Sequence, residues 1–308
     1  MRIFVIVGLL LLSAGAFAAG MDDALLMAQR NCVGISGELS DLKKMAGIGA
    51  AVSGVGVATG GVALGVGIAK ANVDERLEQL KQEVIELSKS AQNIPVYSID
   101  VDWAGFDDAI AVLDVGGQVS AQNNAEIDKL EKKSKTLGNV RTGMLGASTV
   151  TNIVGAVVAN ESKVKGDLQE QINACLSSVK VLEREYNQAR ISRSVSEEQL
   201  AYVKHVITEC GEWQMVDMSV VNSGARGAVV SSGVAAGAGA VGTVTSAMAN
   251  SDSVRDGDDK KEKNLNTVSN VMAGGATVAS VAATVFNVKQ MNSVKKIVSV
   301  ADNCEGAF

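Results

Sequence analysis

Residues 45–69 read MAGIGAAVSGVGVATGGVALGVGIA, a stretch of twenty-five residues that contains eight glycines and no charge. Glycine is less favourable than alanine in a helix interior by about 1 kcal/mol, so an isolated helix of this composition would be unstable in water. The many valines, isoleucines and leucines argue against a solvated coil. We therefore expect a helix that is stabilised from outside, either by a bilayer, which the stretch is long enough to span, or by a partner helix packed on the bare backbone.

Three further uncharged segments follow, at residues 142–160, 227–250 and 264–288. The second and fourth segments and their approaches share seven identities at a constant displacement of 128 residues. These are Lys135, Leu137, Val140, Met144, Gly146, Thr149 and Val150, which recur as Lys263, Leu265, Val268, Met272, Gly274, Thr277 and Val278. Cys32 likewise matches Cys210 at a displacement of 178. The sequence thus predicts two copies of one unit.

The predicted fold is all-α: two tandem copies of a glycine-rich antiparallel helical hairpin, flanked by amphipathic helices. The first hairpin unit covers residues 20–180 and includes a long acidic connector at about residues 70–141. The second covers residues 181–308, with a short connector at about residues 251–263. Within the first connector, residues 96–101 alternate like a short strand.

The small residues of the four segments predict the helix contacts, because closely packed helices need small side chains where they touch. The expected packing glycines are Gly56, Gly60, Gly61, Gly65, Gly143, Gly155, Gly233, Gly237, Gly239 and Gly274. Two ladders of small residues at intervals of four are expected to touch. They are Gly143, Ala147, Thr151, Gly155 and Ala159, and Ser231, Ala235, Gly239, Thr243 and Ala247.

The chain begins MRIFVIVGLLLLSAGAFA, with one early arginine, an apolar run and small residues at its end, which predicts a secretory signal peptide over residues 1–19. In an exported chain the four cysteines are expected to form two disulfides. Three pairings exist, and antiparallel hairpins would bring Cys32 to Cys175 and Cys210 to Cys304. No cysteine has a second one two or three residues away, so no metal site is expected.

Composition and motifs point away from nucleic acid and from enzymes. The net charge of -6 gives no basic footprint, and aromatic residues make up 3% of the chain, too few for base stacking. Gly237, Gly239 and Gly242 match a dinucleotide-binding spacing, but this follows from a glycine-rich composition and no strand precedes them. Residues 252–263 lack the ligands of a calcium loop, and His205 has no candidate nucleophile nearby. No catalytic residue, cofactor or small-molecule substrate is predicted.

The four small-residue segments resemble the glycine-zipper helical hairpins of bacterial envelope proteins and, more loosely, the hydrophobic hairpins of α-helical pore-forming toxins. This resemblance implies self-association or contact with membrane lipid. We expect a non-enzymatic exported protein of the cell envelope whose hairpins pack tightly. Two alternatives are a secreted toxin-like protein that inserts its hairpins later, and a soluble periplasmic helical protein. Basic residues do not indicate an orientation, since the connectors hold 13 and the outer regions of the mature chain 14.

Overall fold

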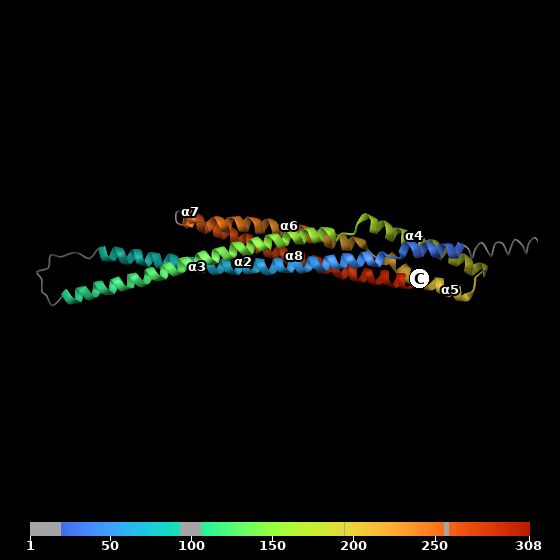
Figure 1. The fold of residues 1–308 in the computed structure, drawn as a ribbon, viewed down its shortest axis with the longest axis horizontal. Helices are drawn as coiled ribbons and strands as arrows, with labels where there is room; N and C mark the ends of the chain where they lie inside the picture. The colour runs from blue at the N-terminus through green and yellow to red at the C-terminus, as the bar shows by residue number, and fades with distance from the viewer. Residues whose placement is uncertain (1–19, 93–105, 194, 256–258) are drawn as a thin grey trace, which may run out of the picture. The chain divides into compact units, whose positions relative to one another are not determined.

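The computed structural model describes residues 20–92, 106–193, 195–255 and 259–308 (Figure 1). All elements within these ranges are helices, which confirms the predicted all-α class. A helix over residues 20–32 comes first. It is followed by α2 (Ile35–Gln92), α3 (Phe106–Glu161), α4 (Gly166–Ser192), α5 (Glu197–Gly211), η2 (Glu212–Met215), α6 (Met218–Ala249), α7 (Asp252–Arg255) and α8 (Asp259–Gly306). The predicted signal peptide and the predicted strand at residues 96–101 lie outside the described residues.

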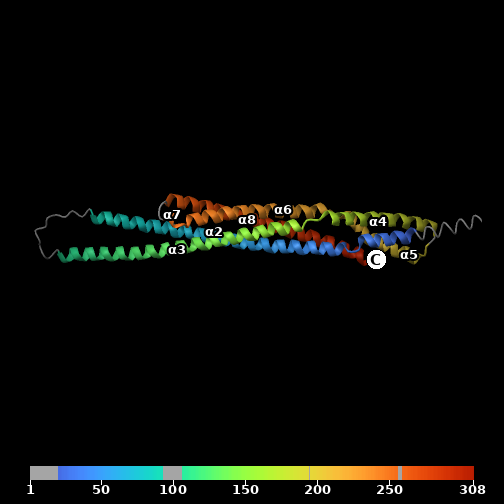
Figure 2. The same ribbon diagram turned by 45° about the horizontal axis from the view of Figure 1, so that its top comes forward.

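The chain forms two compact units that do not follow the predicted boundary near residue 180. Unit 1 contains the residues up to Gly54, Ile153–Gly233 and Val281–Phe308, and unit 2 contains Val55–Asn152 and Val234–Ser280. Each unit therefore takes a segment of α2, α3, α6 and α8. The predicted hairpins exist as neighbouring antiparallel helices, α2 beside α3 and α6 beside α8 (Figures 1 and 2). The division differs because each unit is built from both hairpins.

The predicted connectors are largely helical. Helix α2 continues to Gln92 and α3 begins at Phe106, so most of residues 70–141 extends the first hairpin. The second connector consists of α7 and the first turn of α8. A sequence rich in Glu, Lys and Leu is a good helix former, and the change from glycine to these residues does not interrupt the helix.

Buried positions recur along each long helix at alternating intervals of four and three residues. This is the heptad spacing of a coiled coil, which keeps one face of a helix toward its neighbours. In α2 these positions are Ile35, Leu39, Leu42, Ala46, Gly49 and Ser53 in unit 1, and Gly56, Gly60, Ala63, Gly67 and Lys70 in unit 2. In α3 they are Ser134, Gly138, Arg141, Leu145, Ser148 and Asn152 in unit 2, and Gly155, Ala159 and Ser162 in unit 1.

The predicted ladders at intervals of four therefore form helix contacts at only some of their positions. Gly143 and Ala147 are exposed, whereas Gly155 and Ala159 of the same ladder are buried. With 3.6 residues per turn, a row at strict intervals of four rotates around the helix by about 40° per step, so it leaves the contact face after a few residues. A repeat of seven drifts by only about 20° per heptad and stays on that face.

Unit 1 contains a conventional apolar core. It gathers the helix over residues 20–32 and parts of α2, α4, α5, α6 and α8 around the fully buried Trp213. The turn between the first helix and α2 uses Gly34, whose φ of +99° suits glycine. Glu305 Oε1, near the C-terminus, accepts hydrogen bonds from the backbone N–H groups of Gly34 at 3.0 Å and Ser36 at 2.8 Å. The end of the chain thus caps the start of α2.

Candidate functional site

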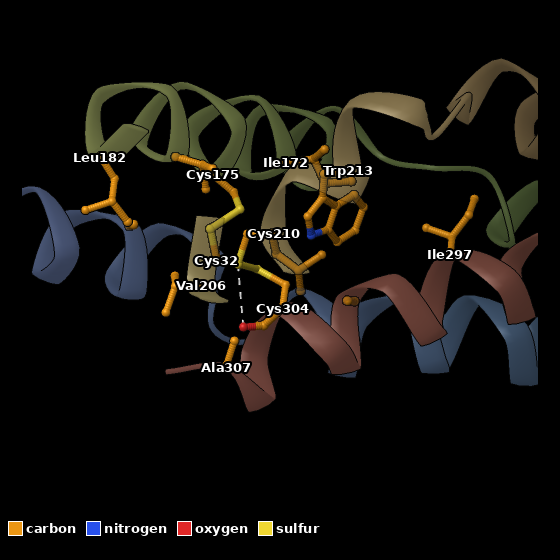
Figure 3. Close-up of a cluster of buried hydrophobic side chains, with 14 of the residues drawn as sticks. Cys32, Ile172, Cys175, Leu182, Val206, Cys210, Trp213, Ile297, Cys304 and Ala307 are labelled. Atoms are coloured by element: carbon orange, nitrogen blue, oxygen red, sulfur yellow. Dashed lines mark hydrogen bonds between the residues drawn. A yellow bond between two sulfur atoms is a disulfide. The ribbon is translucent and has the colours of Figure 1, made fainter. Parts of the chain in front are cut away.

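All four cysteines lie in the core of unit 1 and form the two predicted disulfides, Cys32–Cys175 and Cys210–Cys304 (Figure 3). Their Cα atoms are 4.7 and 4.4 Å apart, and all four residues are buried. The two bridges are neighbours, because the sulfur atoms of Cys32, Cys210 and Cys304 lie within 4.8 Å of one another. Sequence reasoning gave the pairing but not this proximity. Each sulfur is already bonded to another, so the cluster holds no thiolate for a metal.

Among the glycine-rich segments, the helix interior of unit 1 combines polar residues with buried alanines such as Ala46, Ala159 and Ala283. Ser53, Ser162, Ser232, Asn287 and Gln290 are fully buried. Asn287 Nδ2 donates to Ser53 Oγ at 3.1 Å, which joins α8 to α2. Gln290 Nε2 donates to the carbonyl of Ser162 at 2.7 Å, which joins α8 to α3. Side-chain amides and hydroxyls thus link the helices where a water-soluble bundle would place leucines.

The interior of unit 2 is built in the same way. Asn152 Nδ2 donates to the carbonyl of Ser148 at 2.8 Å, and Ser280 Oγ donates to Asn152 Oδ1 at 3.0 Å. Ser148 Oγ donates to the carbonyl of Gly56 at 3.3 Å, which brings α2 into the network. Apolar burial here is slight, because the core cluster of unit 2 consists of Ala63, Leu145 and Ala273.

Four of the ten predicted packing glycines lie at close contacts. A methyl group at Gly60 would lie 2.7 Å from Thr277 Oγ1, and one at Gly239 would lie 2.6 Å from Thr149 Oγ1. At Gly56 it would lie 3.0 Å from Asn152 Oδ1, and at Gly155 it would lie 3.4 Å from Ser232 Oγ. The nearest atoms belong to polar side chains, so these glycines make room for a threonine, asparagine or serine of another helix.

The other six predicted glycines have no such neighbour. A methyl group at these positions would meet no atom within 4 Å. They are Gly61, Gly65, Gly143, Gly233, Gly237 and Gly274. The structure does not place them at a contact between helices, because they stand off the heptad face. Sequence reasoning missed Gly67 and Gly138, each of which packs against an asparagine side chain, Asn270 and Asn250 respectively.

The outer surface of these segments is apolar in both units. In unit 1 the exposed large apolar residues are Met45, Ile48, Ile153, Val154, Val157, Val230, Val281, Val285 and Val288. In unit 2 they are Val55, Val62, Ile68, Val150, Val234, Val241, Val244, Met248, Val268, Val271 and Val278. In a soluble helical bundle the large apolar side chains lie inside and the polar ones outside. Here large apolar side chains lie outside, and small and polar ones fill most of the interior.

Four helical stretches among the described residues are long and apolar enough to cross a membrane, judged by length and composition. They lie within Gly20–Glu86, Gln122–Ser192, Met218–Ala249 and Lys260–Gly306. Only 28% of the most apolar window in each stretch is buried inside the protein. The remaining residues of these windows are partly buried or exposed, and the exposed large apolar ones form the surface just described.

A cluster of buried charges joins three helices of unit 2, beyond the uncharged segments. Lys70 Nζ of α2 lies 2.6 Å from Asp74 Oδ2 and 2.9 Å from Glu262 Oε1 of α8. Ser134 Oγ of α3 donates to Asp74 Oδ1 at 2.5 Å. The fully buried Arg141 donates through Nη2 to the carbonyl of Asn266 at 3.2 Å.

Sequence reasoning did not single out Lys70 or Arg141. The available signal was their place in the heptad. Both occupy the contact face of their helix, Lys70 directly after the first uncharged segment and Arg141 directly before the second. A buried charge needs a partner, so a lysine at a heptad core position predicts a carboxylate on the neighbouring helix. The chemistry of this cluster is the pairing of charges between helices.

The remaining motifs lie on exposed or regular helical surfaces. Gly237, Gly239 and Gly242 stand within the continuous helix α6, so the backbone N–H groups that would bind a phosphate are used within the helix. His205 lies on α5 with an exposed side chain, and its Nδ1 is 3.8 Å from Glu209 Oε1.

No protein-family model, curated protein or solved structure matches this chain.

Proposed function

We propose that this protein is a non-enzymatic, exported protein of the cell envelope whose four glycine-rich helix segments lie in a membrane. In that setting the polar side chains between the helices hold the bundle together, and the exposed valines and isoleucines contact lipid. The role that fits this arrangement is a structural or assembly role that depends on tight helix packing.

The reversed polarity of the helix surfaces is the observation that carries the proposal. A soluble monomer rarely exposes a large continuous apolar surface. In a bilayer the lipid tails are as apolar as valine, so apolar side chains gain nothing by packing inside the bundle. Small residues and hydrogen bonds then provide the attraction between helices. The interiors of both units match this description, with Asn152 and Asn287 as their central amides.

Four crossings return the chain to its starting side. The cysteine-containing segments before, between and after the two pairs of crossings then lie on one side of the membrane. Disulfides persist in oxidising compartments, so that side is the extracytoplasmic one. The part of α2 that follows Lys70 and the part of α3 that precedes Arg141 then lie on the other side of the membrane.

The toxin-like alternative receives less support. A secreted soluble form would have to cover the apolar surfaces until insertion, yet in this conformation they are exposed on all four long helices. The soluble periplasmic alternative meets the same difficulty. Both remain distinguishable by experiment, the first through lysis of liposomes by soluble protein and the second through release from the envelope without detergent.

Extraction tests the proposal directly. The full chain, including its first residues, is expressed in a bacterial host, and the membrane fraction is washed with alkaline carbonate. We expect the protein to remain in the pellet and to be released by detergent. Its appearance in the carbonate supernatant, together with a soluble periplasmic pool, would contradict membrane embedding.

Two matched surface substitutions test whether the apolar surface is in contact with lipid or with water. Val278 is 71% exposed within the apolar surface, and Met215 is 81% exposed in η2, outside it. In water, lysine at either position is expected to change stability by less than about 0.5 kcal/mol. In a bilayer, lysine in the middle of a helix opposes insertion by about 2.5–3.5 kcal/mol. We expect Val278→Lys to reduce carbonate-resistant protein strongly and Met215→Lys to leave it unchanged.

A further inference from the structure

In unit 1, basic residues border the uncharged segments of α2, α6 and α8, and two more lie in the turn that follows α3. Lys43 and Lys44 immediately precede the first uncharged segment, and Arg226 immediately precedes the third. Lys163 and Lys165 follow the second, and Lys289, Lys295 and Lys296 follow the fourth. We call these eight residues the basic border. Four acidic residues lie near them. Asp41 is 2.9 Å from Lys44 and Glu161 is 3.9 Å from Lys165, while Glu212 and Asp217 line a neighbouring pocket together with Lys296.

Contacts within unit 1 place the basic border at one level of the bundle. Val164 N–H, beside Lys163, donates to Asn222 Oδ1 of α6 at 3.0 Å. Gln290 Nε2, beside Lys289, donates to the carbonyl of Ser162. Arg226 is four residues from Asn222, about 6 Å along α6.

The same level extends to α2. A methyl group at Gly47 would lie 3.7 Å from Met291 Sδ. Lys43 and Lys44 precede Gly47 by about one helical turn. Among the described residues, no carboxylate forms an ion pair with Lys43, Arg226 or Lys289. These three positive charges are therefore not neutralised by an ion pair within the described residues.

A shallow groove on α8 joins the apolar surface to the basic border. It is lined by Thr284, Val285, Val288, Lys289, Asn292, Ser293 and Lys296. Its valines belong to the exposed apolar surface, and its lysines belong to the border. An apolar wall that ends in two lysines matches a molecule with a hydrocarbon chain and a negatively charged head.

The basic border lies on the side of the membrane where basic residues are not normally concentrated. Basic residues normally concentrate on the cytoplasmic side, where they fix the orientation of the chain. The basic border lies on the side of the disulfides, which the proposed function assigns to the oxidising compartment. Its lysines therefore have no role in that orientation rule, and basic residues close to a membrane surface attract anionic headgroups.

We propose that the basic border and the α8 groove bind anionic phospholipids, with the phosphate at Lys289 and Lys296 and an acyl chain along Val285 and Val288. This inference rests on the proposed membrane location and adds a lipid class to it. The purified full chain in nonionic detergent is mixed with equal amounts of phosphatidylglycerol and phosphatidylcholine. The lipids that remain bound after size-exclusion chromatography are counted by mass spectrometry at low and at high ionic strength.

We expect the wild-type chain to retain phosphatidylglycerol preferentially, and less so at high ionic strength because salt screens exposed charges. Lys289→Gln with Lys296→Gln should reduce that preference by about fivefold or more, given the attraction of each surface lysine to anionic lipid. The control, Lys132→Gln with Lys133→Gln, removes the same charge from an exposed part of α3 and should keep the preference.

Equal retention of both lipids by the wild type, or equal losses in the two variants, would overturn the inference. Carbonate extraction of the same proteins keeps the two proposals apart. A chain that stays in the membrane without preferring phosphatidylglycerol refutes the lipid site and leaves the membrane location standing. A chain that carbonate releases refutes the membrane location itself.

Discussion

Ser280 Oγ donates a hydrogen bond to Asn152 Oδ1 at 3.0 Å, and the two residues stand 128 positions apart. Gln290 and Ser162 are hydrogen-bonded across the same separation. It is also the displacement at which the identities of the second and fourth uncharged segments recur. Gly60 with Thr277 and Gly239 with Thr149 form a reciprocal pair of contacts. This is the pattern expected when two copies of one hairpin pack around a two-fold axis.

Removing the amide of Asn152 should destabilise the bundle. Asn152→Ala leaves the hydroxyl of Ser148 without its side-chain partner and opens a small gap beside Gly56, at an expected cost of about 1–3 kcal/mol. Thermal unfolding in detergent, followed by circular dichroism, measures the change. Asn124→Ala, at an exposed position of the same helix, is the control and should change little.

Two glycines of α6 that stand two residues apart should respond oppositely to leucine. Gly239→Leu would collide with Thr149 and is expected to cost about 1–3 kcal/mol through overpacking. A methyl group at Gly237 would meet no atom within 4 Å, so Gly237→Leu should be neutral or stabilise the helix by up to about 1 kcal/mol. Equal melting temperatures for the two variants would contradict the contact at Gly239.

Lys70 should matter more than an exposed lysine of the same helix. Its side chain is 2% exposed and lies between Asp74 and Glu262, so Lys70→Met leaves two carboxylates close together and unpaired. We expect a loss of about 2–4 kcal/mol, since Asp74 keeps partial access to solvent. Lys81→Met breaks the exposed pair with Glu131 and should cost less than about 1 kcal/mol. Similar unfolding midpoints for both variants would refute the role given to Lys70.

The second disulfide should contribute substantially to the stability of unit 1. Cys210 and Cys304 are separated by 94 residues, so their bridge restricts a large loop of the unfolded chain. Replacing both by alanine is expected to cost about 2–5 kcal/mol. Peptide mapping of this variant without reduction should still find Cys32 joined to Cys175. Loss of that bridge as well would mean that the two pairings depend on each other.

The start of α6 should show a pH dependence that comes from Asp217. Hydrogen bonds with the side chain and the backbone N–H of Ser219 lower the pKa of Asp217 below its ordinary value. The folded state therefore binds this proton less readily than the unfolded state. The stabilisation is present above the unfolded pKa and is lost as pH falls through the lowered folded value. Asp217→Asn should thus lower the melting temperature at neutral pH, and the difference should shrink in acid.

The sequence was sufficient for the helical class and for the disulfide pairing. In four long uncharged segments the backbone N–H and C=O groups can all be hydrogen-bonded within the segment only if it is a helix. When such helices pair antiparallel, Cys32 comes close to Cys175 and Cys210 comes close to Cys304. These conclusions depend on patterns that extend over tens of residues, so they do not need the details of packing.

The register of the helices was not predicted, although it is present in the sequence. Glycine and alanine occur so often between Ala46 and Gly67 that intervals of four are found as readily as the heptad pattern that the structure uses. Polar residues could have decided between them, because Ser53, Asn152 and Ser280 all occupy heptad positions. The division into two units depends on which parts of the two hairpins contact each other, and these contacts could not be predicted from a single sequence.

The cap that Glu305 places on the start of α2 has a consequence for the order of synthesis. A ribosome releases Cys32 and Cys175 long before it reaches residue 305, so the first bridge can close on an incomplete chain. The backbone N–H groups of Gly34 and Ser36 receive their acceptor only after Glu305 has been made. A chain that stops before Glu305 would accordingly lack the cap at the start of α2.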